Sequence, residues 1–130
     1  MIEKLFNNDN YAMSKALLDV SAARHEALAS NIANVETPGY KRVDVSQTFV
    51  QHLQKLFKSG DKTDKLNLTG VQTPVEADTT ARSTRADGNN VELDTELLNM
   101  GSNEMQYEVM TDFVSQNLSR LKTAITGRNA

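Results

Sequence analysis

The feature that most constrains the fold is a pair of long helical repeats at opposite ends of the chain. Residues 11–35 contain no glycine or proline, and residues 95–126 place apolar side chains at alternating spacings of four and three. At about 1.5 Å per residue, the two helices would be about 40 Å and about 50 Å long, more than a small compact domain needs. We therefore expect an elongated molecule.

In the first repeat, Asp9 or Asn10 is placed to cap the start of a helix that runs to about Val35. The stripe positions are Met13, Leu17, Val20, Arg24, Ala27 and Asn31, widened by Ala16, Ala23, Leu28 and Ile32. This pattern predicts one broad apolar face.

In the second repeat, Asp94 is the expected N-cap of a helix over 95–126, Leu93 is expected to pack on Leu98, and Gly127 is a natural stop. The stripe positions are Leu97, Met100, Glu104, Tyr107, Thr111, Val114, Leu118, Leu121 and Ile125, broadened by Met105, Val109, Met110 and Phe113. Again the apolar face is broad.

The middle of the chain lacks a sustained period. Breaks fall at Thr37-Pro38-Gly39, Ser59-Gly60-Asp61, Gly70, Pro74 and Asp87-Gly88-Asn89-Asn90. A short helix is expected at about 45–57 and a short extended piece at 71–76. Residues 58–69 are expected to be solvated and mobile, and residues 79–90 to form a loop.

These patterns predict a mainly α fold in three parts. Residues 1–40 hold the first helix, residues 41–92 form an irregular and partly flexible middle that leaves room for a short helix and minor β structure, and residues 93–130 hold the last helix. The terminal helices would pair as an antiparallel or slightly crossed coiled coil. Because each stripe is wider than one seam requires, we expect another molecule to supply a third helix.

Composition excludes several functions. With 130 residues, 38% apolar content and no tryptophan, the chain can build only a thin core alone. A net charge of -3 gives no basic field for nucleic acid, and zero cysteines exclude disulfides and thiol chemistry. The first ten residues lack the apolar run of a secretory signal, and no stretch approaches a membrane span.

The chemistry-bearing residues do not form a recognisable active site. His25 and His52 have no cysteine or acid partner set, so we expect no enzyme, no cofactor and no metal site. Residues 92–112 contain six acids and no Lys or Arg, whereas Arg120, Lys122 and Arg128 follow. Helix polarity explains this order, since acids favour a helix start and bases its end; a docking patch is the alternative.

The segment from Asn31 to Tyr40 is the most distinctive. Pro38 keeps Thr37 out of the helical region, Gly39 permits a positive φ, and Asn34 can satisfy backbone groups at the helix end. Tyr40 would then fold back as an apolar anchor. On physical grounds alone, an ordinary helix stop explains the segment.

Ala33-Asn34 followed by Thr37-Pro38-Gly39-Tyr40 resembles the motif of flagellar axial proteins of the rod and hook class. A second match is Asp87-Gly88-Asn89-Asn90-Val91-Glu92-Leu93-Asp94 with Glu96, Tyr107 and the ending from Leu121 to Ile125. Together with the short length, this resembles the small proximal-rod members of the class. The resemblance covers residues 11–57 and 87–127.

This resemblance implies a structural subunit of the rod, which crosses the periplasm and transmits torque, exported by the flagellar type III apparatus without a cleaved signal. Implied partners are further rod subunits of the same and related types (FlgC, FlgF and FlgG), the adaptor FliE and the MS ring. The interaction residues expected are Leu17, Val20, Leu28, Asn31, Ile32, Asn34, Thr37, Pro38, Gly39, Tyr40, Leu97, Tyr107, Val114, Leu118, Leu121 and Ile125.

Three alternatives stay open from the sequence. One is another small rod protein such as FlgC, the second is a helical export chaperone or adaptor, and the third is an enzyme with a polar site that the helices do not reveal.

Overall fold

The computed structural model describes residues 9–59, 72–80 and 85–127, and the fold is mainly helical, as predicted. The elements in chain order are α2 (Asp9–Ala33), β1 (Val43–Val45), α3 (Gln47–Ser59), β2 (Val75–Ala77) and α5 (Leu93–Thr126). The long helices therefore come from the two ends of the chain, and the short elements come from the middle.

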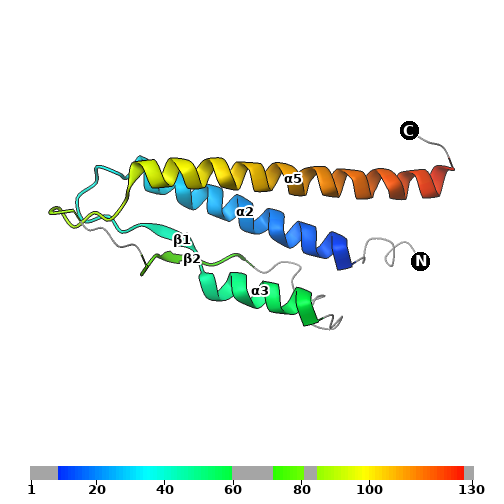
Figure 1. Cartoon of the computed structure of the whole chain (residues 1–130), viewed down its shortest axis with the longest axis horizontal. Helices are drawn as coiled ribbons and strands as arrows, with labels where there is room; N and C mark the ends of the chain where they lie inside the picture. The colour runs from blue at the N-terminus through cyan, green and yellow to red at the C-terminus, as the bar shows by residue number, and fades with distance from the viewer. Residues whose placement is uncertain (1–8, 60–71, 81–84, 128–130) are drawn as a thin grey trace.

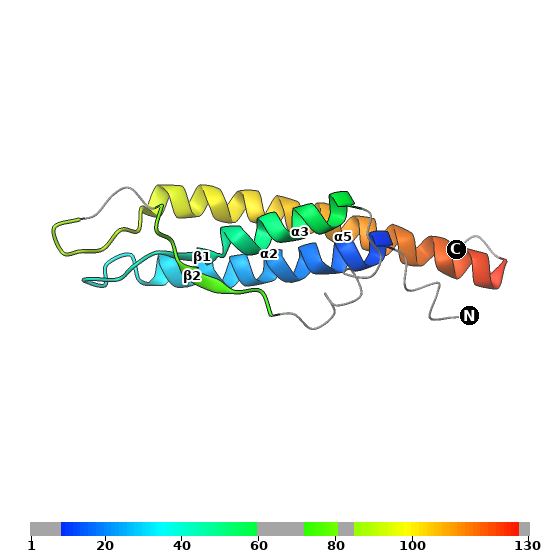
Figure 2. The ribbon, with the colours of Figure 1, turned by 90° about the horizontal axis from the view of Figure 1, so that it is seen from below.

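Helix α2 lies at the centre of an elongated molecule (Figure 1). Helix α5 packs antiparallel along one side of α2, and the strand pair with α3 lies on the other side. In both views the last third of α5 continues past the described start of α2 (Figure 2). The pairing of the terminal helices is thus a coiled-coil-like seam along only part of α5.

The middle segment contains a small antiparallel sheet. Strands β1 and β2 pair with Val43 opposite Ala77, Asp44 opposite Glu76 and Val45 opposite Val75. Backbone bonds extend the pairing at both ends, from Asp78 N–H to the Arg42 carbonyl (2.8 Å) and from Ser46 N–H to the Pro74 carbonyl (2.9 Å). The extended piece expected at 71–76 is realised at 75–77, and residue 71 lies outside the described residues.

Helix α3 is amphipathic, with Leu53 buried, Phe49 and Val50 half-buried and Lys55 exposed. It begins and ends two residues later than predicted, so Lys58 and Ser59 belong to the helix and not to a mobile segment. The rest of the segment expected to be mobile, residues 60–69, lies outside the described residues.

The interior is unusually polar. Among the described residues, the buried apolar side chains are Ala27, Leu28, Val45, Leu53 and Val91, and the buried polar ones are Ser14, Ser21, Asn31, Arg42, Asp44, Ser46, Asn89, Glu96 and Asn103. Buried polar groups destabilise a fold unless they are hydrogen-bonded. The geometry of these bonds therefore decides how the helices are held.

The buried face of α5 is displaced by one residue from half of the apolar repeat seen in the sequence, while Met100, Val114 and Leu121 of the other half are half-buried as the repeat predicts. Glu96 and Asn103 are buried, and Met110 and Asn117 are half-buried on the same face. The apolar-repeat positions one residue later, Leu97 and Leu118 among them, are exposed. The rotation follows from polar bonds: the Asn103 amide donates to the Ser21 carbonyl of α2 (2.9 Å), and Glu96 accepts from Asn31 (3.0 Å).

Several predicted helix ends were wrong. Asp9 and Asn10 already belong to α2, so they do not precede it as caps. Helix α5 begins at Leu93 after Glu92, whose backbone is extended (φ −108°, ψ 107°), so Asp94 lies inside the first turn and is not the N-cap. Helix α2 also ends at Ala33, two residues early, because residues 34–36 already form a turn.

The expected contact between Leu93 and Leu98 was also wrong. A hydrophobic staple requires its first residue to precede the helix cap, whereas Leu93 is the first helical residue, and both side chains are exposed. The predicted stop is confirmed: Gly127 adopts φ 63° and its N–H bonds the Thr123 carbonyl (2.9 Å).

Because the Asn103 amide joins the two long helices, Asn103→Ala should lower the free energy of unfolding by about 1–2 kcal/mol. Gln106→Ala, an exposed change in the same helix, should stay within about 0.5 kcal/mol of the unaltered protein. Urea unfolding followed by circular dichroism measures both. Equal effects of the two variants would show that the bond does not stabilise the helix pair.

Candidate assembly site

The turn after α2 is built by the motif residues that the sequence singled out. The Asn34 amide donates to the Ser30 carbonyl (2.9 Å), and its oxygen accepts from the Thr37 hydroxyl (3.2 Å). Gly39 has φ 74°, as predicted, which a residue with a Cβ rarely adopts. Asn34 therefore ends the helix by satisfying a carbonyl of its last turn.

Tyr40 folds back onto α2, but it does so through its polar tip and is not only an apolar anchor. Its hydroxyl donates to Asn31 Oδ1 (3.3 Å) and lies 3.1 Å from the Ser30 hydroxyl oxygen. The ring is half-buried. The turn is thus closed onto the last two turns of the helix that it follows.

Asn89 fixes this turn from a distant part of the chain. Its side chain is fully buried, and its amide donates to the carbonyls of Asn34 (3.0 Å), Val35 (3.1 Å) and Thr37 (2.9 Å). Its oxygen accepts from Val91 N–H (2.8 Å). One side chain therefore satisfies backbone groups of the turn and orients the chain that enters α5.

Two further hydrogen bonds complete this junction. Gly39 N–H donates to the Asp87 carbonyl (2.8 Å), and the Arg85 guanidinium donates to the Val35 carbonyl (2.9 Å). Gly88 has φ 83°, and a Cβ placed on it would lie 3.6 Å from Gly39 Cα. The turn 34–40 and the loop 85–91 thus form one unit at the end of the helix pair.

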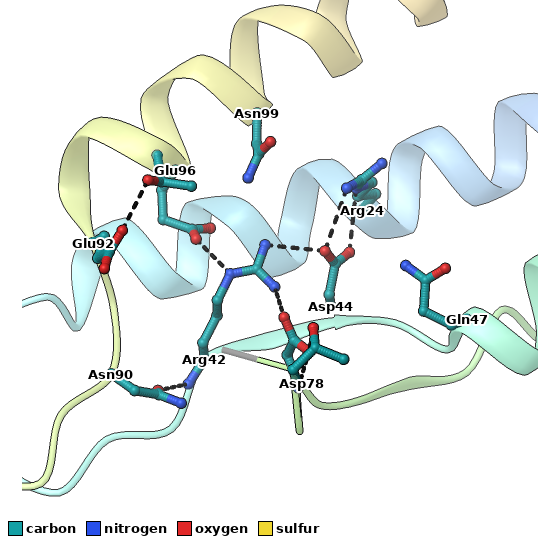
Figure 3. A pocket seen from close by; sticks show the side chains of 11 residues that line it. Arg24, Arg42, Asp44, Gln47, Asp78, Asn90, Glu92, Glu96 and Asn99 are labelled. Atoms are coloured by element: carbon teal, nitrogen blue, oxygen red, sulfur yellow. Dashed lines mark hydrogen bonds and ion pairs between the residues drawn. The ribbon is translucent and has the colours of Figure 1, made fainter. Parts of the chain in front are cut away.

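A cluster of charged side chains beside this unit joins all the layers of the fold (Figure 3). Arg42, which directly precedes β1, donates to Glu96 of α5 (2.5 Å), to Asp44 of β1 (3.0 Å) and to Asp78 after β2 (2.5 Å). Glu96 is 1% exposed. All three nitrogens of the buried Arg42 guanidinium therefore have carboxylate partners. These partners offset the free-energy cost of removing the charge from water.

Asn31 completes the cluster from α2. Its amide donates to Glu96 Oε2 (3.0 Å) and to the Val43 carbonyl (2.8 Å), and its oxygen accepts from Val43 N–H (2.9 Å). Arg24 lies about two turns before Asn31 in α2. Its Nε atom is 3.2 Å from Asp44 Oδ1. The central helix is thereby bonded to β1 on one side and to α5 on the other.

The surroundings shift the pKa values of two members of the cluster, Arg42 and Asp78. Burial acts to lower the pKa of Arg42, but hydrogen bonds to Glu96 and Asp44 outweigh it and raise the pKa above its ordinary value. Burial alone would raise the pKa of Asp78, whereas hydrogen bonds from Thr80 and the charge of Arg42 lower it. Both shifts favour the charged forms.

A polar hollow of about 460 Å³ lies over the cluster and is lined by its side chains. The carboxylates of Asp44, Asp78 and Glu96 in this hollow are already bonded to Arg42, so they form structural ion pairs and not a set of free acids. Within residues 9–59, 72–80 and 85–127, no group of three or more His, Asp or Glu side chains is placed to hold a metal ion.

The outward side of α5 is strongly apolar. Leu98, Met105 and Val109 are 76%, 68% and 57% exposed; apolar side chains exposed elsewhere around the helix are Leu93, Leu97, Tyr107, Phe113, Leu118 and Ile125. A hollow of about 260 Å³ between the helices is lined by Met13, Ser14, Leu17, Val109, Met110 and Phe113. Exposed apolar surface on this scale is typical of protein interfaces.

The structure divides the interaction residues predicted from the sequence into three groups. Leu28 and Asn31 are buried. Those half-buried are Leu17, Val20, Ile32, Asn34, Tyr40, Val114 and Leu121, and those exposed are Thr37, Pro38, Gly39, Leu97, Tyr107, Leu118 and Ile125. Asn31, Asn34, Thr37 and Tyr40 are brought together in the turn, whereas the exposed leucines of α5 have no place in the described helix seam.

The sequence patterns did not point to Arg42 or Asn103. They included Asn89 and Glu96 only as part of the resemblance to flagellar axial proteins and gave them no structural role. A signal was present for two of them: Glu96 and Asn103 are seven residues apart, the repeat distance of a helix seam, but polar residues at that spacing were given no weight. Arg42 and Asn89 owe their roles to contacts far apart in the sequence.

The Asn89 bonds predict a large effect from one substitution. Asn89→Ala removes the donor that three backbone carbonyls of the turn share, so the free energy of unfolding should fall by about 2–3 kcal/mol. Asn117→Ala is the matched control, because the Asn117 amide bonds the Phe113 carbonyl within its own helix. Urea unfolding of both variants tests this; a loss below about 1 kcal/mol for Asn89→Ala would contradict the assigned role.

The lowered pKa of Asp78 predicts a dependence on acid. A carboxyl group with a depressed pKa stabilises the fold above its ordinary pKa of 3.8 and loses that contribution as the pH falls through the lowered value. Asp78→Asn lacks the contribution at every pH. The difference in unfolding free energy between the two proteins should therefore be largest near neutral pH and shrink below pH 3.8; a constant difference would refute the ion pair.

Comparison with known proteins agrees with this arrangement. A family described as flagella basal body rod protein matches residues 21–41, which are the second half of α2 and the motif turn. The flagellar basal body rod protein FlgB of Aeromonas hydrophila is 32% identical, over 96% of this chain and 95% of that protein.

Two further proteins of the same name extend the similarity to other bacteria. That of Escherichia coli K12 is 30% identical over 86% of this chain and 89% of its own length. That of Borreliella burgdorferi is 31% identical over 76% and 82%. The chain therefore belongs to the FlgB family of flagellar basal body rod proteins, which are structural proteins of the flagellum and not enzymes.

Proposed function

We propose that this chain is a subunit of the proximal rod, which assembles with other axial proteins through its terminal helices into a helical shaft. The shaft would cross the periplasm and transmit torque. The chain has no catalytic role in this proposal, and it leaves the cell through the flagellar type III export apparatus without a cleaved signal. Family membership supports the placement in the basal body.

The observation that carries the proposal is the inversion of polarity around α5. Its inward face contains Glu96 and Asn103, whereas Leu98 and Met105 point outward, and both of these and Val109 are more than half exposed. In an isolated molecule this arrangement leaves much of the apolar area of the helix in water. Burying such area would contribute a favourable free energy of about 25 cal/mol per Å². Covering that surface with neighbouring chains supplies the free energy for assembly.

The three parts of the chain have different tasks in this proposal. The parts 1–40 and 93–130 contain the assembling helices, in which Leu17 lies opposite Met110 and Phe113, while Val114 and Leu121 would meet neighbours. Residues 41–92 sit beside α2 and are tied to it by Arg42. The unit formed by Asn34–Tyr40 and the loop 85–91 fixes the angle at which the chain leaves the helices.

The neighbours proposed are further copies of this chain, the related rod proteins FlgC, FlgF and FlgG, the adaptor FliE and the MS ring. None of the described helices is long and apolar enough to cross a membrane. We expect the exposed apolar residues of α5 to make the contacts with these neighbours.

Motility tests the proposal. In a strain of the source bacterium that lacks this gene, a copy with Met105→Asp and Val109→Asp should fail to restore swimming, because two charges are placed on the exposed apolar face. Ser115→Asp, at an exposed polar position of the same helix, should restore it. Circular dichroism of the purified variants verifies that each is folded.

Basal bodies isolated from these strains give the direct readout. The double variant should be absent from them, whereas the Ser115→Asp protein should be present. Normal swimming with the double variant would rule out assembly through this face.

A further inference from the structure

The charges of α5 are divided between its two ends. Exposed acids occupy the first two-thirds of the helix, at Asp94, Glu104, Glu108 and Asp112, and no Lys or Arg occurs before Arg120. The last third contains Arg120 and Lys122 and no acid. Both bases are exposed. One helix therefore presents an acidic surface and a basic surface at different positions along its axis.

The acids flank a specific apolar ridge. With about 3.6 residues per turn, Leu98, Met105 and Val109 fall on one line along α5, and they are its most exposed large apolar side chains apart from Ile125. Asp94, Glu108 and Asp112 fall on a parallel line next to it, on the side reached by turning back about 40–80° about the helix axis. The ridge thus has an acidic border on that side.

The last third of α5 carries the complementary pattern. It runs past the described start of α2, and Leu118 and Ile125 are exposed there (Figure 2). Lys122 lies beside the line that joins them, on the side reached by turning forward about 50°. Leu118 and Ile125 are seven residues apart, the same separation as Leu98 and Met105.

We propose that the last third of α5 of one copy packs, parallel, along the Leu98–Met105 ridge of a second copy. Leu118 then lies beside Leu98 and Ile125 beside Met105, and Lys122 lies on the side of the seam that holds Asp94 and Glu108. The two copies are shifted by 20 residues, which is about 30 Å along the axis. This inference rests on the proposed function and specifies its copy-to-copy contact.

The charge positions select the parallel orientation. When two parallel helices face each other, the backward flank of one meets the forward flank of the other, as in the paired e and g positions of coiled coils. The acids lie on the backward flank of the ridge, and Lys122 lies on the forward flank of the tail. In an antiparallel pair Lys122 would point away from the acids.

A second copy fits better than an unrelated chain because both halves of the contact are present on one helix. The two surfaces differ, so the contact is heterologous and leaves a free ridge and a free tail at opposite ends of every assembly. Repetition produces a polar filament that does not close. A rod subunit needs that property.

Cross-linking between engineered cysteines tests the register, since the native chain has no cysteine. A mixture of Met105→Cys and Ile125→Cys chains, one carrying a mass tag, should form a disulfide between unlike chains under mild oxidation. The two positions are about 30 Å apart on one helix, far beyond the Cα separation of about 7 Å that a disulfide allows, so only two copies can join.

The matched control is a mixture of Leu98→Cys and Ile125→Cys chains, which an antiparallel contact would join. We expect at least a five-fold lower yield of mixed dimer from this mixture. An equal or higher yield from the control, or no mixed dimer from either mixture, would overturn the proposal. If neither mixture forms a mixed dimer, the ridge is covered by a protein other than a second copy of this chain.

A charge exchange tests the polar part of the contact. Lys122→Glu in the Ile125→Cys chain should lower the yield of the mixed disulfide several-fold, and Glu108→Lys in the Met105→Cys chain should restore it. Unchanged yields would exclude the proposed orientation. These measurements use purified protein, so they separate this contact from the proposed function: loss of swimming without the predicted cross-link would leave the rod assignment standing and remove this register.

Discussion

The ion pair between Arg42 and Glu96 is the interaction on which the rest of the structure depends. A buried carboxylate and a buried guanidinium are unfavourable alone, so each residue requires the other in place. Because Arg42 precedes β1 and Glu96 lies in the first turn of α5, the pair determines where the strand layer and the last helix meet. Asn31 binds the same carboxylate and brings in α2. Loss of one partner would leave an unpaired charge at the point where every layer joins.

The polar interior has a consequence for the surface. An α5 that turned its leucines inward would bury them against α2 and leave little apolar surface for a neighbour. Glu96 and Asn103 hold the helix in a different rotation, and Leu93, Leu97 and Leu98 stay exposed. The monomer therefore gives up hydrophobic stabilisation that the assembled rod can recover. Hydrogen bonds, which are directional, are well suited to fixing such a rotation, whereas apolar packing tolerates several.

The motif turn shows how far local sequence rules reach. The stop after α2, the positive φ of Gly39 and the role of Asn34 were all predictable, since they depend on residues within one turn of each other. The same rules placed the N-cap of α5 at Asp94, which was wrong because the chain enters α5 in the direction fixed by Asn89 and Val91. The contacts of Asn89 reach back more than fifty residues, and no local pattern contains them.

The sequence by itself determined the two long helices, the broken middle with its short amphipathic helix, the C-terminal stop at Gly127 and the relationship to flagellar axial proteins. Helical periodicity and turn residues act over short distances, so they can be read in one dimension. Only the tertiary structure decided which face of α5 is buried, that Arg42 and Asn89 join distant segments, and that the most apolar line of the last helix faces outward. Those features depend on which polar groups find partners across the fold, and a polar residue in a helical repeat does not reveal by its position alone whether it has one.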